Sequence, residues 1–310
     1  MTESLAYAVS LRGITKRFGP TTALNDVSFD IESGACFGLI GPNGAGKTTA
    51  FSIVAGFLHP DEGMAVVLDH DARATDVLKA RLSVLPQDAL LPSHETVGEF
   101  LVHLARLQGI PAGKAEHEAR VALKDVDGAD WWTRRCGKLS HGMMKRVGLA
   151  QAFLGNPEVV LLDEPTAGLD PKIAFEIRTL IKKRKGACTL IISSHNLHEL
   201  EEICDAAAIM DHGHVVASGS MEELTAAAKE IRILVASSAV PMDKLRAIPG
   251  ITRADFDKHD RILSVYFEEF PGEAEEMIAQ VLYVLLQDNV RISGLSKGKG
   301  LERRVMELTD

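Results

Sequence analysis

The sequence of 310 residues predicts an α/β fold with a helical insertion, followed by a smaller α+β domain. Three observations support this prediction. Apolar runs of strand length alternate with stretches of helical periodicity. A glycine-rich loop separates one apolar run from the helix that follows it. Near the C-terminus the pattern indicates the order β-α-β-β-α-β. We therefore expect one domain over residues 1–225, with a helical subdomain at about residues 88–156, and a second over residues 226–310.

The glycine-rich loop lies between a predicted buried strand at Ala35–Ile40 and a predicted helix at Ala50–Ala55. It fits the phosphate-binding pattern G-x-x-x-x-G-K-[ST]. Its residues are Gly41, Pro42, Asn43, Gly44, Ala45, Gly46, Lys47, Thr48 and Thr49. The glycines allow backbone N–H groups to face anionic oxygens, and the helix start adds its positive dipole end. Lys47 is expected to contact the β- and γ-phosphates, and the Thr48 hydroxyl to bind Mg²⁺.

The composition is ordinary for a soluble globular protein, with 46% hydrophobic and 25% charged residues. The net charge of -9 argues against nucleic acid as a ligand, because such binding uses a broad basic surface. The four cysteines show neither a C-x-x-C pair nor zinc-ligand spacing, which is typical of a reduced cytosolic chain. No signal peptide is evident, and no window reaches the roughly 18 uncharged apolar residues of a spanning helix. Any membrane role would therefore depend on a partner.

Two residues on either side of the phosphate loop are candidates for contacts with a nucleotide. Phe18 lies in a predicted loop between strands at Ala8–Gly13 and Val27–Ile31. Its ring either stacks on an adenine or covers an edge of the core. Gln87 ends a short predicted strand that begins at Leu82. Its amide either binds Mg²⁺ or the attacking water, or it lies on the surface.

The insertion contains helices with recognisable starts. Thr96 and Glu99 form a predicted capping box before the first of them. Ser140 is the expected N-cap of a later helix, and with Gly142 it makes an anion site at the helix N-terminus. A monomer with its own phosphate loop has no need of this second site. It is therefore expected to close over a nucleotide held by another copy.

Two further apolar runs end in polar residues. Val159–Glu164 is a predicted buried strand in which Asp163 is placed to hold Mg²⁺ and Glu164 to polarise the attacking water. Asp170 follows, and it either caps the next helix or crosses to a partner subunit. The second run, Thr189–His195, ends in a histidine that either contacts the γ-phosphate or has a structural role.

In this order, the motifs resemble those of the nucleotide-binding subunit of an ATP-binding cassette (ABC) transporter, over about residues 8–220. They are the phosphate loop Gly41–Thr49, the glutamine loop at Gln87, the signature Leu139–Met143, the carboxylate strand Val159–Glu164, the loop Ala167–Asp170 and the switch histidine His195. The resemblance implies a P-loop NTPase core of the ABC ATPase type. It also implies ATP and Mg²⁺ as ligands.

The resemblance further implies that two subunits, expected to be identical copies, enclose two ATP molecules head to tail. The catalytic and metal-binding residues of one copy would face Ser140 and Gly142 of the other. Glu164 resembles the family's general base, and Phe18 resembles the aromatic residue that stacks on adenine. The facing set is Lys47, Thr48, Gln87, Asp163, Glu164 and His195.

The signature departs from the usual L-S-G-G-Q form, because His141 replaces the first glycine and Met143 replaces the glutamine. Ser140 and Gly142, which would approach the γ-phosphate, are retained, so activity is expected. The missing glutamine amide puts its usual nucleotide contact in doubt. Simple tolerance of His141 is favoured over a proton-sensing role.

The C-terminal region indicates, in order, a strand at Glu230–Ala236, a helix at Met242–Ala247, strands at Ile251–Phe256 and Ile262–Phe267, a helix at Ala274–Leu286 and a strand at Val290–Ile292. This order suggests a ferredoxin-like domain. It resembles the accessory domain on cassette subunits of two-component exporters. A closing helix is expected at Gly300–Leu308.

The expected function is therefore ATP hydrolysis that powers transport, in the export direction, through a separate integral membrane permease. The chain would lie in the cytoplasm, on the inner face of the cell membrane, through that permease. The alternative is a soluble ABC-type ATPase that acts in cofactor assembly or another non-transport process. The absence of a coiled-coil arm, zinc cysteines and a second cassette weighs against versions in DNA repair or translation.

Overall fold

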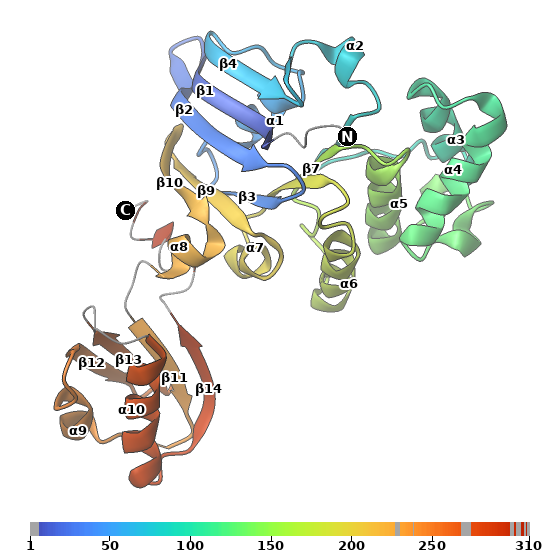
Figure 1. Ribbon diagram of the computed structural model, residues 1–310. Helices are drawn as coiled ribbons and strands as arrows, with labels where there is room; N and C mark the ends of the chain where they lie inside the picture. Colours follow the sequence, from blue (N-terminus) through green and yellow to red (C-terminus); the bar gives the residue numbers. More distant parts are fainter. Residues whose placement is uncertain are drawn as a thin grey trace. The chain divides into compact units, whose positions relative to one another are not determined.

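The computed structural model describes residues 6–226, 230–237, 239–267 and 274–297, together with residues 301, 305, 306 and 308. The chain divides into two compact units, the first ending at Ser220 and the second beginning at Met221 (Figure 1). This division lies a few residues before the predicted boundary. The assignment of an ATPase domain and an accessory domain to the two parts stays a prediction.

A six-stranded sheet in the order β10-β9-β3-β8-β7-β6 runs through the first unit. Its strands are β3 (Cys36–Ile40), β6 (Leu82–Leu85), β7 (Val159–Asp163), β8 (Thr189–Ser193), β9 (Ala206–Asp211) and β10 (His214–Ser220). Neighbours from β9 to β6 are parallel, so the carboxyl ends of these five strands lie at one edge of the sheet. Every residue of β3, β7 and β8 is buried, which explains why their sequences are continuous apolar runs.

A second sheet of this unit has the order β2-β1-β4-β5 and is antiparallel. Its strands are β1 (Tyr7–Phe18), β2 (Thr21–Glu32), β4 (Glu62–Val67) and β5 (His70–Asp71). The prediction of a loop around Phe18 is wrong, because β1 continues to Phe18, which pairs with Thr21. Four irregularities of register interrupt the alternation of β1, so the pattern of its second half does not indicate a strand.

Three helices form the insertion: α3 (Val97–Leu107), α4 (Ala112–Asp125) and α5 (His141–Phe153). Figure 1 shows them grouped at one side of the first unit. The connection between α4 and α5 contains the 3-10 helices η1 (Ala129–Trp131) and η2 (Cys136–Lys138). The predicted capping box is confirmed. The Thr96 hydroxyl accepts a hydrogen bond from Glu99 N at 3.2 Å, and Glu99 Oε2 accepts one from Thr96 N at 2.8 Å.

The other helices of the first unit are α1 (Lys47–Val54), α2 (Thr75–Leu78), α6 (Pro171–Lys182) and α7 (Leu197–Ile203). Of the helices that the structure describes, none is both long enough and apolar enough to cross a membrane. Strand β6 ends at Leu85, two residues earlier than predicted, because Pro86 has no N–H group to continue the ladder.

The second unit begins with α8 (Met221–Ala226) and continues with β11 (Glu230–Val235), α9 (Met242–Arg246), β12 (Ile251–Asp257), β13 (Ile262–Phe267), α10 (Ala274–Gln287) and β14 (Ile292–Lys297). Its antiparallel sheet has the order β12-β13-β11-β14. Strand β13 lies between the two strands that α9 connects, which is a split β-α-β arrangement. The ferredoxin-like assignment stays a prediction, and most of the closing helix expected at Gly300–Leu308 lies outside the described residues.

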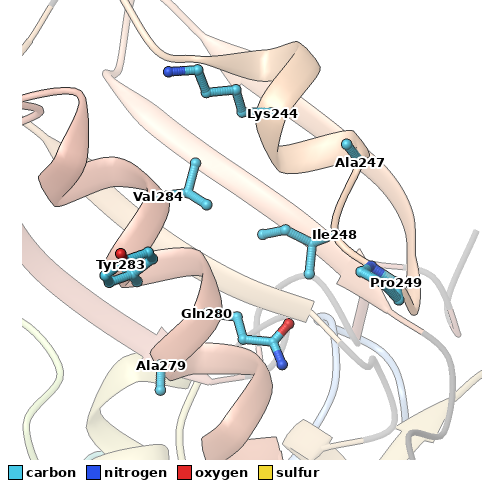
Figure 2. A pocket seen from close by; sticks show the side chains of 8 residues that line it. All are labelled: Lys244, Ala247, Ile248, Pro249, Ala279, Gln280, Tyr283 and Val284. Carbon is cyan, nitrogen blue, oxygen red and sulfur yellow. The ribbon is translucent and has the colours of Figure 1, made fainter.

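The apolar sides of α9 and α10 pack with the sheet residues Ile231, Leu263 and Val265 in the core of the second unit. Between the two helices lies an open groove of about 500 Å³ (Figure 2). The aliphatic side chains of Ile248 and Val284 lie between Lys244 at one end and Gln280 at the other in this view. Lys244 forms an ion pair with Asp288 at 2.6 Å, which joins the two helices.

Candidate functional site

A cavity of about 320 Å³ in the first unit brings together segments that are far apart in the sequence. It is lined by Phe18, Ala23, Asn43, Gly44, Gly46, Lys47, Thr48, Thr49, Gln87, Asp163 and Glu164. Most of these residues lie at or after the carboxyl ends of β3, β6 and β7, which are parallel strands of one sheet, with β8 between β3 and β7. Ligand sites of open α/β sheets lie at such an edge. Of the lining residues, Ala23 is one that the sequence interpretation did not single out.

The loop after β3 needs glycine at two close approaches of the backbone. Gly41 has a φ of +154°, and a Cβ there would lie 2.3 Å from Met210 O. Gly46 has a φ of +103°, and a Cβ there would lie 2.7 Å from Ala23 O. Gly46 is also the N-cap of α1, and within the described residues no side chain caps this helix. The first N–H groups of α1 therefore carry no side-chain cap, which suits an anionic ligand.

Lys47 is a buried cation at the start of α1, with 8% of its surface exposed. Its Nζ donates hydrogen bonds to Gly41 O at 2.6 Å and to Pro42 O at 3.0 Å. Burial lowers the pKa of Lys47, while the nearby charges of Glu164 and Asp163 act in the opposite direction. The ammonium group is thus poorly hydrated, and two carbonyl oxygens of its own loop hold it where it supplies positive charge to the cavity.

Ser193 of β8 holds the carboxylate of Asp163 and the main chain of Glu164 at the end of β7. Strands β7 and β8 pair in parallel, with Asp163 opposite Ser193. The fully buried Ser193 hydroxyl donates a hydrogen bond to Asp163 Oδ1 and accepts one from Glu164 N at 3.0 Å. Glu164 has a φ of +48°, a left-handed conformation that costs a non-glycine residue about 1–2 kcal/mol. Sequence interpretation missed Ser193, although a polar residue inside an apolar strand was a visible signal.

His195 joins this group through Glu164. Its Nδ1 lies 2.8 Å from Glu164 Oε2, and its side chain is 67% exposed. An ionised carboxylate can only accept a hydrogen bond, so Nδ1 carries the proton and Nε2 remains free to face a ligand. His195 follows β8 by two residues and lines a neighbouring cavity of about 330 Å³ with Thr166 and Asn196.

Ser140 and Gly142 do not line the cavity of the phosphate loop in their own chain. Ser140 is the N-cap of α5, as predicted, and its hydroxyl accepts a hydrogen bond from Met143 N at 3.4 Å. Gly142 allows close packing against α6, because a Cβ there would lie 2.9 Å from Ile173 Cγ2. The replacement His141 lies beside Gly168 of the loop after β7, since a Cβ at Gly168 would be 3.2 Å from its Cε1.

Asp170 is the N-cap of α6, which confirms the first of its two predicted roles. Its Oδ1 accepts hydrogen bonds from Lys172 N and Ile173 N, both at 3.1 Å. Asp170 does not line the phosphate-loop cavity either.

Three oxygen-bearing side chains of the cavity have the chemistry of ligands for a hard cation: the Thr48 hydroxyl, the Gln87 amide and the Asp163 carboxylate. Among the described residues, no cluster of three or more His, Cys, Asp or Glu side chains is arranged to hold a metal. A cation such as Mg²⁺ would then need oxygens from a phosphate ligand, which is how Mg²⁺ is commonly bound.

Comparison with known proteins gives matches for the first unit. A family model described as ABC transporter matches residues 24–167, and one described as AAA domain, putative AbiEii toxin, Type IV TA system matches residues 137–201. The chain is 35% identical over 217 residues to the uncharacterized ABC transporter ATP-binding protein YxlF of Bacillus subtilis, covering 70% of this chain and 72% of that protein. It is 36% identical over 225 residues to the Nod factor export ATP-binding protein I of Bradyrhizobium diazoefficiens, with coverage of 70% and 72%.

Two solved structures share the fold. One is cbiO1 from Clostridium perfringens, described as part of the ABC transporter complex cbiONQ, with a TM-score of 0.64, 27% identity and coverage of 71% of this chain and 91% of that one. The other is the ADP conformation of an ATP-binding cassette of an ABC transporter, with a TM-score of 0.64, 25% identity and coverage of 71% and 95%.

Proposed function

The chain belongs to the ATP-binding proteins of ABC transporters, and on this premise we propose that it hydrolyses ATP in the phosphate-loop cavity to power a separate membrane permease. The observation that carries the proposal is the gathering of Lys47, Thr48, Asp163 and Glu164 in one cavity. Anion-binding groups, oxygen donors for a cation and a carboxylate for proton transfer are the parts that phosphoryl transfer to water requires.

The phosphate loop and Lys47 bind the triphosphate of ATP in this proposal. The uncapped start of α1 supplies backbone N–H groups, and the buried ammonium group supplies positive charge. Phe18, at the end of β1, is 50% exposed and lines the same cavity. Its ring is available to stack on the adenine.

Thr48, Gln87 and Asp163 would hold Mg²⁺ together with phosphate oxygens. The cation neutralises charge that develops on the transferred phosphoryl group. Asp163 is prepared for this role by Ser193, whose hydroxyl holds one carboxylate oxygen in place.

Glu164 acts as the general base that accepts a proton from the attacking water. The hydrogen bond between His195 Nδ1 and Glu164 Oε2 orients this carboxylate. In the imidazolium form, His195 Nε2 donates to the γ-phosphate, because only then do both ring nitrogens carry protons.

The active form is a dimer in which Ser140 and Gly142 of a second copy complete the site. Ser140 is exposed at the N-terminus of α5, a 13-residue helix, and it does not line the cavity of its own chain. An exposed helix start is suited to approach the γ-phosphate of a nucleotide bound by another subunit. Asp170 caps α6, whose Ile173 lies beside Gly142, and it would contribute to the contact with the second copy.

The direction of transport is export, and the chain works at the inner face of the cell membrane through its permease. Support comes from the relatives that are named as Nod factor export ATP-binding proteins. For the second unit we propose a role in dimer contact and stability.

The substitution Glu164→Gln tests the hydrolytic mechanism. It keeps the size of the side chain and removes its capacity to accept a proton. The rate of ATP hydrolysis by the purified chain should fall by roughly 10²–10⁴-fold, while equilibrium binding of ATP persists.

The matched control is Glu158→Gln, at an exposed carboxylate that precedes β7 and pairs with Arg81 at 2.6 Å. It should retain the activity of the unmodified chain. Undiminished hydrolysis by Glu164→Gln would remove Glu164 as the base.

Coupling to a permease is tested by a tagged pull-down from detergent-solubilised membranes of the native host. A polytopic membrane protein at stoichiometric yield is expected. Recovery of an active ATPase without any membrane protein would contradict the transport proposal and favour an ABC-type ATPase that acts outside transport.

A further inference from the structure

Lys145 of α5 makes a contact that neither the motifs nor the proposed mechanism uses. It is only partly exposed, and its Nζ donates a hydrogen bond to the main-chain oxygen of Gln87 at 2.9 Å. The two residues belong to segments 58 positions apart in the sequence. The contact therefore links the helix that begins after Ser140 to the loop that carries Gln87.

The loop at Gln87 has little backbone support of its own. The ladder between β6 and β7 ends at the pair Leu85 and Leu162, two residues before Gln87. Pro86 then contributes no N–H donor. A hydrogen bond from a charged donor is stronger than one between neutral groups, so Lys145 is well suited to fix the position of this turn.

Three carboxylates act on the charge of Lys145, two of which belong to the site. Burial lowers the pKa of Lys145, and the carboxylates Asp88, Glu164 and Asp163 act in the opposite direction. Lys145 thus lies within the field of both carboxylates of the site while it holds the main chain of Gln87. The Gln87 side chain lines the same cavity as those carboxylates.

We propose that Lys145 is a positioning residue that holds the Gln87 loop against α5, so that the place of the Gln87 amide in the cavity depends on the position of this helix. The inference rests on the proposed function and deepens it. When the N-terminus of α5 engages a nucleotide on a second copy, Lys145 passes the displacement of the helix to Gln87. The position of the Gln87 amide in the cavity thereby depends on whether the facing subunit has closed.

Hydrogen–deuterium exchange of the full chain tests the contact without reference to activity. In Lys145→Met, the amides of residues 87–90 should exchange severalfold faster, while those of α5 keep the rates of the unmodified chain. The variant Lys145→Arg, which retains a charged donor, should restore slow exchange. Lys124→Met, at an exposed lysine of α4, is the matched control and should change neither segment. Unchanged exchange at residues 87–90, or faster exchange in α5 as well, would overturn the inference.

A double-mutant cycle tests whether Lys145 acts through Gln87. Lys145→Met alone should lower kcat by about tenfold, the loss expected for one charge-assisted hydrogen bond that positions a reacting group. In the background of Gln87→Ala it should lower kcat no further, because the amide that it positions is gone. If Lys145→Met lowers kcat by the same factor with and without Gln87→Ala, Lys145 acts on the carboxylates or on folding, and the inference is overturned.

Thermal melting of each variant separates these effects from loss of structure. If Lys145→Met lowers the melting temperature, Lys145→Leu takes its place with the same expected outcomes, since it is also apolar and carries no hydrogen-bond donor. If the unmodified chain itself hydrolyses no ATP, the proposed function fails, and the exchange experiment alone decides the role of Lys145.

Discussion

Ser193 supports the carboxylate of Asp163 and the main chain of Glu164, so Ser193→Ala should affect stability and catalysis together. The substitution removes the hydrogen bond to Asp163 Oδ1 and the one accepted from Glu164 N, at a side chain with 0% exposure. Glu164 N retains the main-chain oxygen of Ser193 at 3.2 Å, so the main loss is the bond to the charged carboxylate. Such a bond contributes about 1.5–3 kcal/mol to the free energy of unfolding.

For a unit of this size, about 2 kcal/mol corresponds to a melting temperature lower by roughly 4–8 °C. The rate of ATP hydrolysis should fall by about 10–100-fold, because small displacements of a catalytic group have effects of this order. Both quantities are measured on the purified chain, by circular dichroism during heating and by phosphate release.

Ser83→Ala is the matched control, since Ser83 is a buried serine of β6 that pairs with Val160 rather than with a carboxylate. It should leave the rate of hydrolysis unchanged. If Ser193→Ala melts and hydrolyses ATP like the unmodified chain, Ser193 does not hold the carboxylates and the reasoning is refuted.

Three further predictions follow from the geometry. Gly46→Ala should weaken the binding of a fluorescent ATP analogue by more than about tenfold, because a Cβ would lie 2.7 Å from Ala23 O; unchanged affinity would contradict the close approach. His195→Ala should lower kcat by about tenfold or more with little change in the affinity for ATP, since it removes the contact at 2.8 Å to Glu164 Oε2; steady-state kinetics and a binding titration separate the two. Burial raises the pKa of Cys188 from 9.0 to about 11. The folded protein therefore keeps this thiol protonated more strongly than the unfolded chain does, and its contribution to the free energy of unfolding is complete below pH 9 and lost as the pH rises to about 11. Urea denaturation at several pH values should show a loss of about 2 kcal/mol over that range that is absent in Cys188→Ala, and identical pH dependence of the two proteins would exclude the thiol as its source.

Features that depend on neighbouring residues could be predicted from the sequence. The capping box of Thr96 and Glu99 and the N-caps Ser140 and Asp170 are confirmed, because each is set by side chains within three residues of the helix start. The buried strand that ends at Asp163 is confirmed for a similar reason, since a continuous apolar run is itself the signal.

Contacts that depend on register or on the approach of distant segments could not be predicted. Ser193 meets Asp163 only because β7 and β8 pair without a shift, and no local pattern specifies that register. The contact of Lys145 with Gln87 requires α5 to pack beside β6. Strand β1 was shortened in the prediction because its irregular register hides the alternation that leads to Phe18. The nucleotide-binding fold itself is confirmed by relatives and by solved structures.

The contacts of Lys47 make the phosphate loop partly self-supporting. Two of the three N–H directions of its ammonium group are taken by carbonyl oxygens of the same loop, Gly41 O and Pro42 O. Lys47 thus stabilises the shape of the loop and also supplies positive charge. A neutral substitution at this position removes the two hydrogen bonds as well as the positive charge. Weaker nucleotide binding in such a variant therefore has two causes, a change in the shape of the loop and the lost attraction for phosphate. An effect at Lys47 is therefore larger than the contribution of a single ion pair.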